Sequence, residues 1–293
     1  MRQIPVKCNQ ELIKSGVRTD GRQPTQHRPF SISFGPDFGC CLVSVGNSKV
    51  LTQISAVLAE PRLTRPSEGV INIRVDLSML GSTNYDTSRN SDECVQLSRL
   101  LHKGIRDARC IDLEALCIIS GEKVWHIQVD VSVLNHEGNL IEVSSVSALA
   151  ALAHFRRPDV SVDDGNIIVH PFETREPIRL TMLHFPFLMK FAFFREATVS
   201  FVDPSEDEEK FCDGYLIVGA NIFGEITLLH IAGKSLISKD QILKQCNYAV
   251  GQTRVLNDKL KTALDQDETE RQRAKREKQF YAGNIYQVLA SVY

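Results

Sequence analysis

Hydrophobic and polar residues alternate across residues 125–133, and the features that follow this run organise the first half of the chain. The hydrophobic positions are Trp125, Ile127, Val129, Val131 and Val133. Their period of two predicts a strand with one buried face. Residues 136–139 (HEGN) then favour a tight turn, and the small residues that recur from Leu140 to Ala153 predict a helix lying close against a sheet. A strand that turns through glycine into a helix N-terminus can hold phosphate, so this turn is a candidate anion site.

Similar patterns predict further strands in both halves of the chain. In the first half, strand-like alternation runs from Arg28 to Leu58 with a hairpin signal at 46–48, and another strand is expected at 70–75. In the second half, strands are expected at 179–202, 215–220 and 225–231. The pattern favours an α+β fold made of two duplicated βα-rich halves, with mixed sheets packed on helices.

Two helices are expected to follow capping signals. Ser91 precedes two acidic residues, which favours a helix from there to about Asp107. Ser238, with Gln241 three residues later, is a capping-box pattern that opens a helix to about residue 264. We therefore expect five segments, namely an N-terminal arm or helix (1–27), a first half (28–158), a linker with room for one short hairpin (159–178), a second half (179–264) and a charged tail (265–293), which is either a helix or a frayed end.

The first of these helices carries a candidate nucleic-acid contact. Its apolar residues Cys94, Leu97, Leu101 and Ile105 share one side at helical spacing, and Arg99, Lys103 and Arg106 share the other. A row of three cations is compatible with two interpretations. It is either a solvated outer face or a stripe that follows the backbone of a nucleic acid.

Composition excludes several classes of protein. The 293 residues are 43% hydrophobic and 24% charged with a net charge of -2, which indicates an ordinary globular protein and argues against a wholly basic nucleic-acid coat. The eight cysteines form no CxxC pair, so we expect reduced thiols. With no apolar signal core in residues 1–10 and no stretch of membrane-spanning length, a soluble intracellular protein is expected.

Carboxylates provide the second candidate site. Residues 203–210 form an acid-rich loop, and Asp213 follows at the head of a strand. Two acids brought together here could bind Mg²⁺ or act as general acid and base, although such loops are more often simply solvated. The histidines show no metal-binding spacing, and no P-loop, GxSxG or GxGxxG motif is present. We therefore expect no metal site and no cofactor.

Several motifs together resemble one family. They are RTDGR (18–22), FGPDFGCC (34–41), PSEG (66–69), GEKVW (121–125), LNHEGNLIE (134–142) and HFRRPDV (154–160). In these the chain is similar to the RNase PH-type ring subunits of the eukaryotic RNA exosome, with the closest likeness to the exosome component nine type, also called the polymyositis/scleroderma autoantigen type. The likeness covers the chain to about residue 264. It implies the RNase PH-like fold, which agrees with the two halves expected above.

The resemblance also implies that phosphorolysis has been lost. Active members attack the RNA 3′ end with phosphate held at a Gly-Gly-Thr/Ser-Arg-Thr turn. Here Gly138 is followed by Asn139, Leu140, Ile141 and Glu142. Leu and Ile offer no side-chain donor, and a carboxylate about 4 Å from phosphate costs on the order of 4 kcal/mol, roughly a thousandfold in affinity. The expectation is a non-catalytic subunit with a degenerate phosphate turn.

The remaining site residues follow the same resemblance. Asp207 and Asp213 match the two acids of active relatives, so the alternative is an active phosphate-dependent 3′→5′ exoribonuclease that uses them. Arg99 and Lys103 match arginines that hold RNA in inactive ring subunits, with Arg106 and Arg89 as further RNA-binding candidates. A third possibility is a scaffold that never touches RNA. The implied partners are RNA, an active-type RNase PH-like subunit in a heterodimer, other ring subunits, RNA-binding cap subunits and associated hydrolytic nucleases. No membrane is implied, and the expected location is the nucleus, including the nucleolus, and the cytoplasm.

Overall fold

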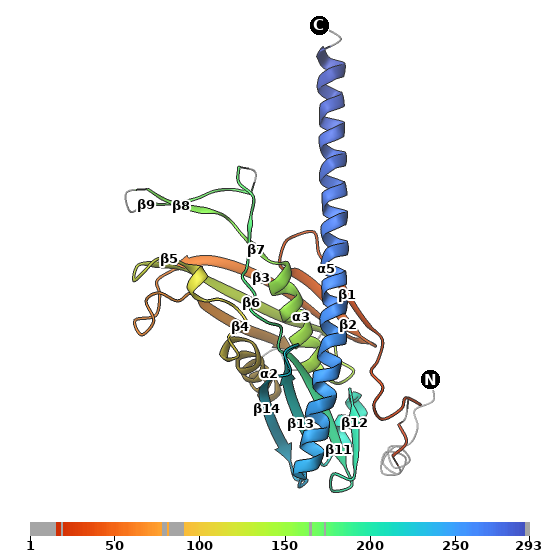
Figure 1. Ribbon diagram of the computed structural model, residues 1–293. Helices are drawn as coiled ribbons and strands as arrows, with labels where there is room; N and C mark the ends of the chain where they lie inside the picture. Colours follow the sequence, from red (N-terminus) through yellow and green to blue (C-terminus); the bar gives the residue numbers. More distant parts are fainter. Residues whose placement is uncertain are drawn as a thin grey trace.

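The computed structural model describes residues 16–18, 20–77, 81, 91–163, 166–172 and 174–290, with side chains up to residue 276 except that of Asn166. Two β-sheets, one from each half of the chain, pack against shared helices (Figure 1). The α+β fold with mixed sheets is therefore confirmed. Among the described residues, no helix combines the length and the apolar character needed to cross a membrane.

The first sheet has six strands in the order β1-β2-β3-β6-β4, with β5 pairing β6. The strands are β1 (Phe30–Phe34), β2 (Cys40–Val45), β3 (Ser48–Ala59), β4 (Val70–Leu77), β5 (Cys117–Ile119) and β6 (Lys123–Asn135). The β4–β6 pair is parallel, whereas the other pairs are antiparallel. The long alternating run at 125–133 is thus the strand β6, next to the edge strand β4, and its apolar side is fully buried.

The helix α3 (Leu140–His154) lies between the two sheets (Figure 1). Its serines and its alanines other than Ala153 are buried, because the helix contacts β2 and β3 on one side and β11 on the other. Ser147 and Thr52 share a buried hydrogen bond of 2.7 Å, and the Ser145 hydroxyl accepts from the Leu188 N–H at 3.1 Å. Small side chains therefore let the helix approach both sheets closely, and the Ser145 and Ser147 hydroxyls are hydrogen-bonded within this contact.

The second sheet has the order β12-β11-β13-β14, and every pair is antiparallel. Its elements are β11 (Phe187–Phe194), β12 (Val199–Val202), α4 (Glu206–Phe211), β13 (Gly214–Ala220) and β14 (Ile226–Gly233). Between the sheets, the chain forms the small pair β7 (Arg156–Arg157) with β10 (Ile178–Arg179) and the hairpin β8 (Val160–Asp163) with β9 (Asn166–Val169). That hairpin lies within the expected linker and projects from the body (Figure 1).

The helix expected from Ser91 divides into two parts. It is α-helical in α2 (Asp92–Leu101) and π-helical in η1 (His102–Asp107), and a 3₁₀ turn, η2 (Glu114–Leu116), follows. The Ser91 side chain accepts from the Cys94 N–H at 3.2 Å, which confirms the predicted cap. A Cβ at Gly104 would lie 2.7 Å from a methyl of Leu188, so glycine allows η1 to pack directly on β11.

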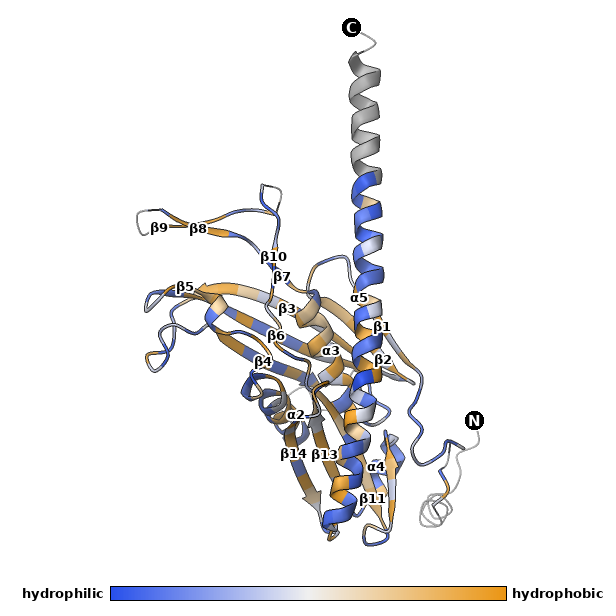
Figure 2. Ribbon diagram, in the orientation of Figure 1, coloured by the Kyte–Doolittle hydropathy of each residue, from blue (hydrophilic) through white to orange (hydrophobic). Residues whose placement is uncertain are grey.

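The last helix, α5 (Lys239–Ala290), is much longer than the sequence pattern predicts. The Ser238–Gln241 capping box is present, with bonds of 3.0 and 3.3 Å, but the helix does not end near residue 264. Figure 2 shows its apolar side where it lies against the body and a hydrophilic surface beyond. Polar contacts extend its anchorage, since Asp267 lies 3.1 Å from His154 and the Arg271 guanidinium donates to the Pro36 carbonyl at 2.6 Å. Of the two alternatives left open for the tail after residue 264, the structure shows the helix, because this charged segment gains partners from the first half.

The seven described cysteines are free thiols, as expected, and Cys8 lies outside the described residues. Burial raises the pKa of the Cys41 thiol and that of the Cys110 thiol. These thiols therefore remain protonated and act as small apolar groups in the core.

Candidate functional site

The turn that joins β6 to α3 keeps the backbone shape expected of an anion site. Gly138 has φ +93° and Asn139 has φ 55°, both in the left-handed region. A Cβ at Gly138 would lie 2.4 Å from the carbonyl carbon of Ser205, so only glycine fits where α4 begins. The Gly138 carbonyl accepts from the Ser48 hydroxyl at 2.9 Å. The turn is therefore fixed by contacts from both halves of the chain.

An internal carboxylate occupies the N-terminus of α3. Glu209, from α4, accepts the Asn139 N–H at 2.9 Å through Oε1. The same oxygen lies 2.7 Å from Lys190 Nζ on β11, and this ion pair is largely buried. A backbone N–H at a helix start and a nearby lysine are the groups that would hold a phosphate oxygen. Here the side chain of Glu209 already holds both.

The residues after Gly138 behave in two different ways. Leu140 and Ile141 line the adjacent cavity, and their side chains offer no hydrogen-bond donor to it. Glu142 does not line this cavity, and its carboxylate instead lies 3.3 Å from His27 Nδ1 and accepts from the Asn139 side chain at 2.7 Å. Direct repulsion of phosphate by Glu142 is therefore the wrong explanation, because the carboxylate that meets the helix start belongs to Glu209.

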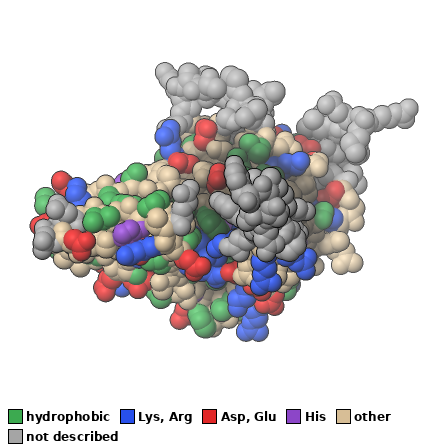
Figure 3. Space-filling model, turned by 90° about the horizontal axis from the view of Figure 1, so that it is seen from above, with side chains coloured by type: hydrophobic (Ala, Val, Ile, Leu, Met, Phe, Trp, Pro, Cys, Tyr) green, Lys and Arg blue, Asp and Glu red, His purple; other side chains and the backbone are tan. Residues whose placement is uncertain are grey.

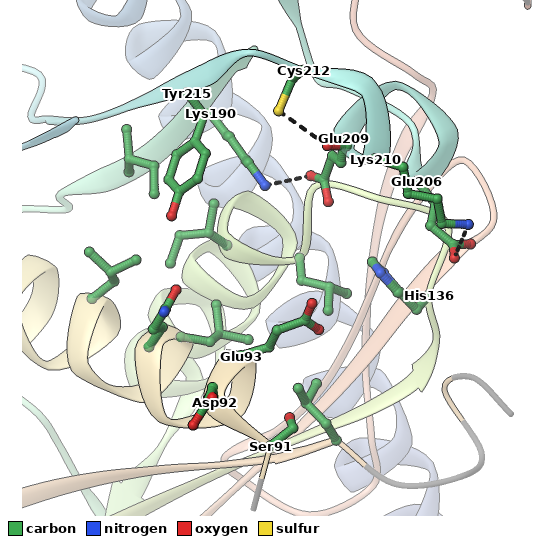
Figure 4. Close-up of a pocket in the computed structure, with 17 residues that line it drawn as sticks. Ser91, Asp92, Glu93, His136, Lys190, Glu206, Glu209, Lys210, Cys212 and Tyr215 are labelled. Atoms are coloured by element: carbon green, nitrogen blue, oxygen red, sulfur yellow. Dashed lines mark hydrogen bonds and ion pairs between the residues drawn. The ribbon is translucent and has the colours of Figure 1, made fainter. Parts of the chain in front are cut away.

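The cavity beside the turn has a volume of about 650 Å³ and lies between α2, α4 and β11 (Figure 4). Its polar lining includes Lys190, His136 and Glu93, together with Glu206 and Lys210, which pair with one another at 2.8 Å. The ring of Tyr215 lies beside Lys190, whose Nζ is 5.0 Å from the ring centroid. Four acidic side chains line the cavity against two lysines, so its walls are not basic; these acids are Asp92, Glu93, Glu206 and Glu209. Such a lining disfavours polyanion binding.

Behind the turn, a buried ionic network joins the N-terminal segment to the β12–α4 loop. Asp203 is fully buried and accepts from Arg28 Nη2 at 2.7 Å, from Arg22 Nη1 at 3.0 Å and from the Asn139 amide at 2.8 Å. Burial alone would raise the pKa of Asp203, but the hydrogen bonds and charge of Arg28 outweigh burial and lower it to about 2. Arg18 and Glu208 form a second, fully buried pair at 2.7 Å.

The two acids that match active relatives lie outside the cavity. Asp207 is 60% exposed on α4, and its nearest cation is Lys210 at 3.6 Å. Asp213 is exposed at the start of β13, where its backbone bonds to Phe193 and Lys234. Neither side chain lines the cavity, whereas Glu206 and Glu209 do. The described residues hold no group of three or more His, Cys, Asp or Glu placed to bind a metal ion.

The structure separates the three cations of the predicted stripe. Arg99 and Lys103 are exposed, and Lys103 lies near enough to His230 on β14 to help burial lower the pKa of that histidine. A π-helical turn needs more residues than an α-helical one, so Arg106 turns away from them. It borders a small depression with Arg62 and Arg65 from the β3–β4 loop. Arg89 lies outside the described residues. Arg99 and Lys103 thus remain neighbours on the exposed face, whereas Arg106 lies with Arg62 and Arg65.

Sequence reasoning missed Arg62, Arg65 and the carboxylate that closes the helix start. No local signal identifies Glu209, because its partners Asn139 and Lys190 are 70 and 19 residues away. On the face seen in Figure 3, basic and acidic side chains are interspersed, so a charge count would not reveal the arginines either.

A family model described as 3′ exoribonuclease family, domain 1 (RNase PH), matches residues 26–158. A Danio rerio protein named exosome complex component RRP45 is 40% identical over 272 residues, which are 91% of this chain and 69% of that relative. This chain belongs to the RRP45 family of exosome components. The Schizosaccharomyces pombe member is 34% identical over 87% of this chain and 88% of its own length.

Longer relatives and solved structures complete the comparison of this RRP45 family member. The Bos taurus RRP45 is 39% identical over 92% of this chain, yet the chain spans only 62% of that relative. An Archaeoglobus fulgidus exosome with RNA bound to the active site matches with a TM-score of 0.76 and 24% identity, covering 88% of this chain and 99% of the other. An archaeal exosome core gives a TM-score of 0.73 at 24% identity, covering 87% and 97%. At this identity the structures support the fold, which agrees with the expected RNase PH type.

Proposed function

We propose that this chain is a non-catalytic structural and RNA-path subunit of the RNA exosome ring. In that role it supports 3′→5′ RNA processing and decay, including rRNA maturation, RNA surveillance and mRNA turnover. Membership of the RRP45 family supports the place in the ring. The observation that carries the non-catalytic role is Glu209, whose carboxylate holds the Asn139 N–H and Lys190 where an active subunit would need free donors.

The proposal extends to partners and location. The chain forms a heterodimer with an active-type RNase PH-like subunit, joins the other ring subunits, and meets RNA-binding cap subunits and associated hydrolytic nucleases. It acts in the nucleus, including the nucleolus, and in the cytoplasm. Within the ring it takes the position of the exosome component nine type, the polymyositis/scleroderma autoantigen type. The sequence motifs support the component nine type, and the RRP45 relatives support a place among the exosome components.

The absence of phosphorolysis is tested in the assembled heterodimer. The complex is incubated with labelled RNA, Mg²⁺ and phosphate, and release of nucleoside diphosphate is compared between the wild type, Asp207→Asn and Asp213→Asn. Both acids are exposed and outside the cavity, so neither substitution should change any release that the partner produces. Release that requires phosphate and disappears with Asp213→Asn in this chain would establish the alternative, an active exoribonuclease.

The RNA path is tested at Arg99 and Lys103. Both are exposed on adjacent turns, and among the described residues neither has a carboxylate within 4 Å, so their charges are available to a phosphate backbone. Lys103 can neutralise a phosphate but lacks the two-pronged fork of arginine. Crosslinking of RNA in the assembled ring should fall with Arg99→Glu and Lys103→Glu together. Arg254→Glu, an exposed arginine on α5, is the matched control, and unchanged crosslinking in the double variant would support a scaffold without RNA contact.

A further inference from the structure

The outermost strand of the second sheet, β14, has a free edge. It pairs with β13 on one side, and no described strand pairs with its other side. Leu229 is 48% exposed and Ile231 45% exposed, which is high for aliphatic residues at the centre of an eight-residue strand. An unprotected edge of this length with apolar side chains is a template for another strand. The edge therefore requires a partner or a device that blocks pairing.

The backbone of this edge is oriented for pairing. The Lys234 N–H donates to the Asp213 carbonyl at 2.8 Å, and Gly214 faces Gly233 across the ladder. Because backbone groups of a strand point alternately to its two sides, residues 232, 230 and 228 also direct theirs at β13. The N–H and carbonyl groups of Leu229 and Ile231 therefore point to the open side. Leu229 and Ile231 therefore each offer an exposed aliphatic side chain and a backbone amide that points to the open side.

The apolar face of the sheet continues past the helix that covers it. Leu229 faces Val218 and Ile231 faces Leu216, so these four side chains share one face. Val218 and Leu216 are fully buried in a cluster that includes Ala249 of α5. The side chains on β14 are only half covered. A strand added beyond β14 would bring its own aliphatic residues to this face and extend the buried layer.

The charged side chains along the edge of β14 indicate which kind of strand fits there. His230 occupies the opposite face, with Lys103 of η1 beside it, and Lys234 is exposed at the end of the strand. The acid nearest to this edge in the chain, Glu225, is already engaged with the Asn221 amide at 2.7 Å. Antiparallel pairing of two copies centred on this strand would bring each Lys103 towards its own copy. Like charges placed opposite one another are unfavourable, so a different chain carrying a carboxylate fits better.

We propose that the free edge of β14 receives an extended segment of a neighbouring RNase PH-like ring subunit. The segment carries aliphatic side chains at every second position and a carboxylate opposite Lys103 and His230. This inference rests on the proposed ring function and specifies the surface through which the chain joins its neighbour. In this arrangement Lys103 contacts the neighbouring subunit where η1 meets β14, so the RNA contact of the proposed function rests on Arg99.

The test measures amide hydrogen exchange at single-residue resolution in the full chain, alone and assembled with RNase PH-like exosome subunits. Assembly should slow exchange of the Leu229 and Ile231 amides roughly 100-fold or more, as expected for amides that gain a partner in a buried ladder. The amides of Leu228 and His230 already bond to β13 and serve as internal controls. A ring that assembles without added protection at Leu229 and Ile231 would overturn the inference and leave the ring function standing.

Other outcomes assign the edge differently. Failure of the chain to join any RNase PH-like subunit would overturn the proposed function itself. Protection that appears only after RNA is added would assign the edge to RNA, and protection in the isolated chain that disappears on dilution would assign it to a second copy; either would overturn the inference.

A pair of variants adds a binding measurement. Ile231→Pro removes an amide that points to the open side, so the β13–β14 ladder stays intact, whereas Ile231→Thr keeps that amide. Affinity for the neighbouring subunit should fall roughly 10- to 100-fold with proline, the effect of one unsatisfied buried group, and much less with threonine. Equal affinities for the two variants, with folding verified by circular dichroism, would contradict the pairing.

Discussion

Asp203→Asn is the perturbation whose effect can be worked out best from the structure. Asp203 is fully buried and holds Arg28, Arg22 and the Asn139 amide at once. Burial acts to raise the pKa of Asp203, but the opposing effect of Arg28 is larger, so the pKa falls from the ordinary 3.8 to about 2. That difference corresponds to about 2 kcal/mol of stability. Breaking a buried pair costs about 3–5 kcal/mol because the remaining charge loses its partner. We therefore expect Asp203→Asn to lower the free energy of unfolding by about 2–4 kcal/mol at pH 7.

The measurement is urea denaturation of the full chain, with Asp207→Asn as the matched control. Asp207 is four residues away, but it is exposed, and its nearest cation among the described residues is Lys210 at 3.6 Å. An exposed pair of this kind contributes at most about 1 kcal/mol. The pH dependence gives a second check. A lowered carboxyl pKa stabilises the fold above pH 4, and this contribution is lost as pH falls from about 4 to about 2. Equal losses for Asp203→Asn and Asp207→Asn at pH 7 would refute the reasoning.

Three further outcomes are expected. Glu209→Ala should free the Asn139 N–H and Lys190 and so create weak phosphate binding, which NMR titration would measure. The control Glu206→Ala should create no such binding. Equal phosphate binding by the two variants would contradict the conclusion that Glu209 occupies the helix start. Truncation after residue 264 should destabilise the whole chain by about 1–3 kcal/mol, since it removes the contacts of Asp267 and Glu268, and truncation after 276 should have little effect. The purified chain alone should aggregate through its exposed apolar residues, without pairing of two β14 edges, and addition of its ring partner should suppress this in light scattering; a stable monomer would count against it.

The elements that local patterns determine were predictable from the sequence. The strand β6, the turn at Gly138 and the helix α3 follow from period-two alternation, turn chemistry and small residues that are adjacent in the chain. The caps at Ser91 and Ser238 were predictable for the same reason, since a cap involves residues three apart. Local physics decides these features, so a single sequence is sufficient.

The features that were missed depend on residues far apart in the chain. The π-helical turn η1 packs Gly104 on Leu188, 84 residues further along the chain, and helical spacing alone does not predict that Arg106 turns away from Lys103. The pair of Arg18 and Glu208 spans 190 residues. The role first given to Glu142 shows the same limit. The sequence shows correctly that Glu142 follows the turn. Only the fold shows that the carboxylate facing the helix start belongs to Glu209.

The helix α5 has a consequence for how the two halves unfold. It packs on β13 and β11 of the second half and on β1 of the first, and Figure 1 shows it running along both. Glu268 of α5 also forms an ion pair of 2.6 Å with Arg179 of β10, outside both large sheets. Neither half can therefore open without releasing the same helix. Two halves that look like independent copies in sequence are bound into a single cooperative unit, with one unfolding transition in place of two.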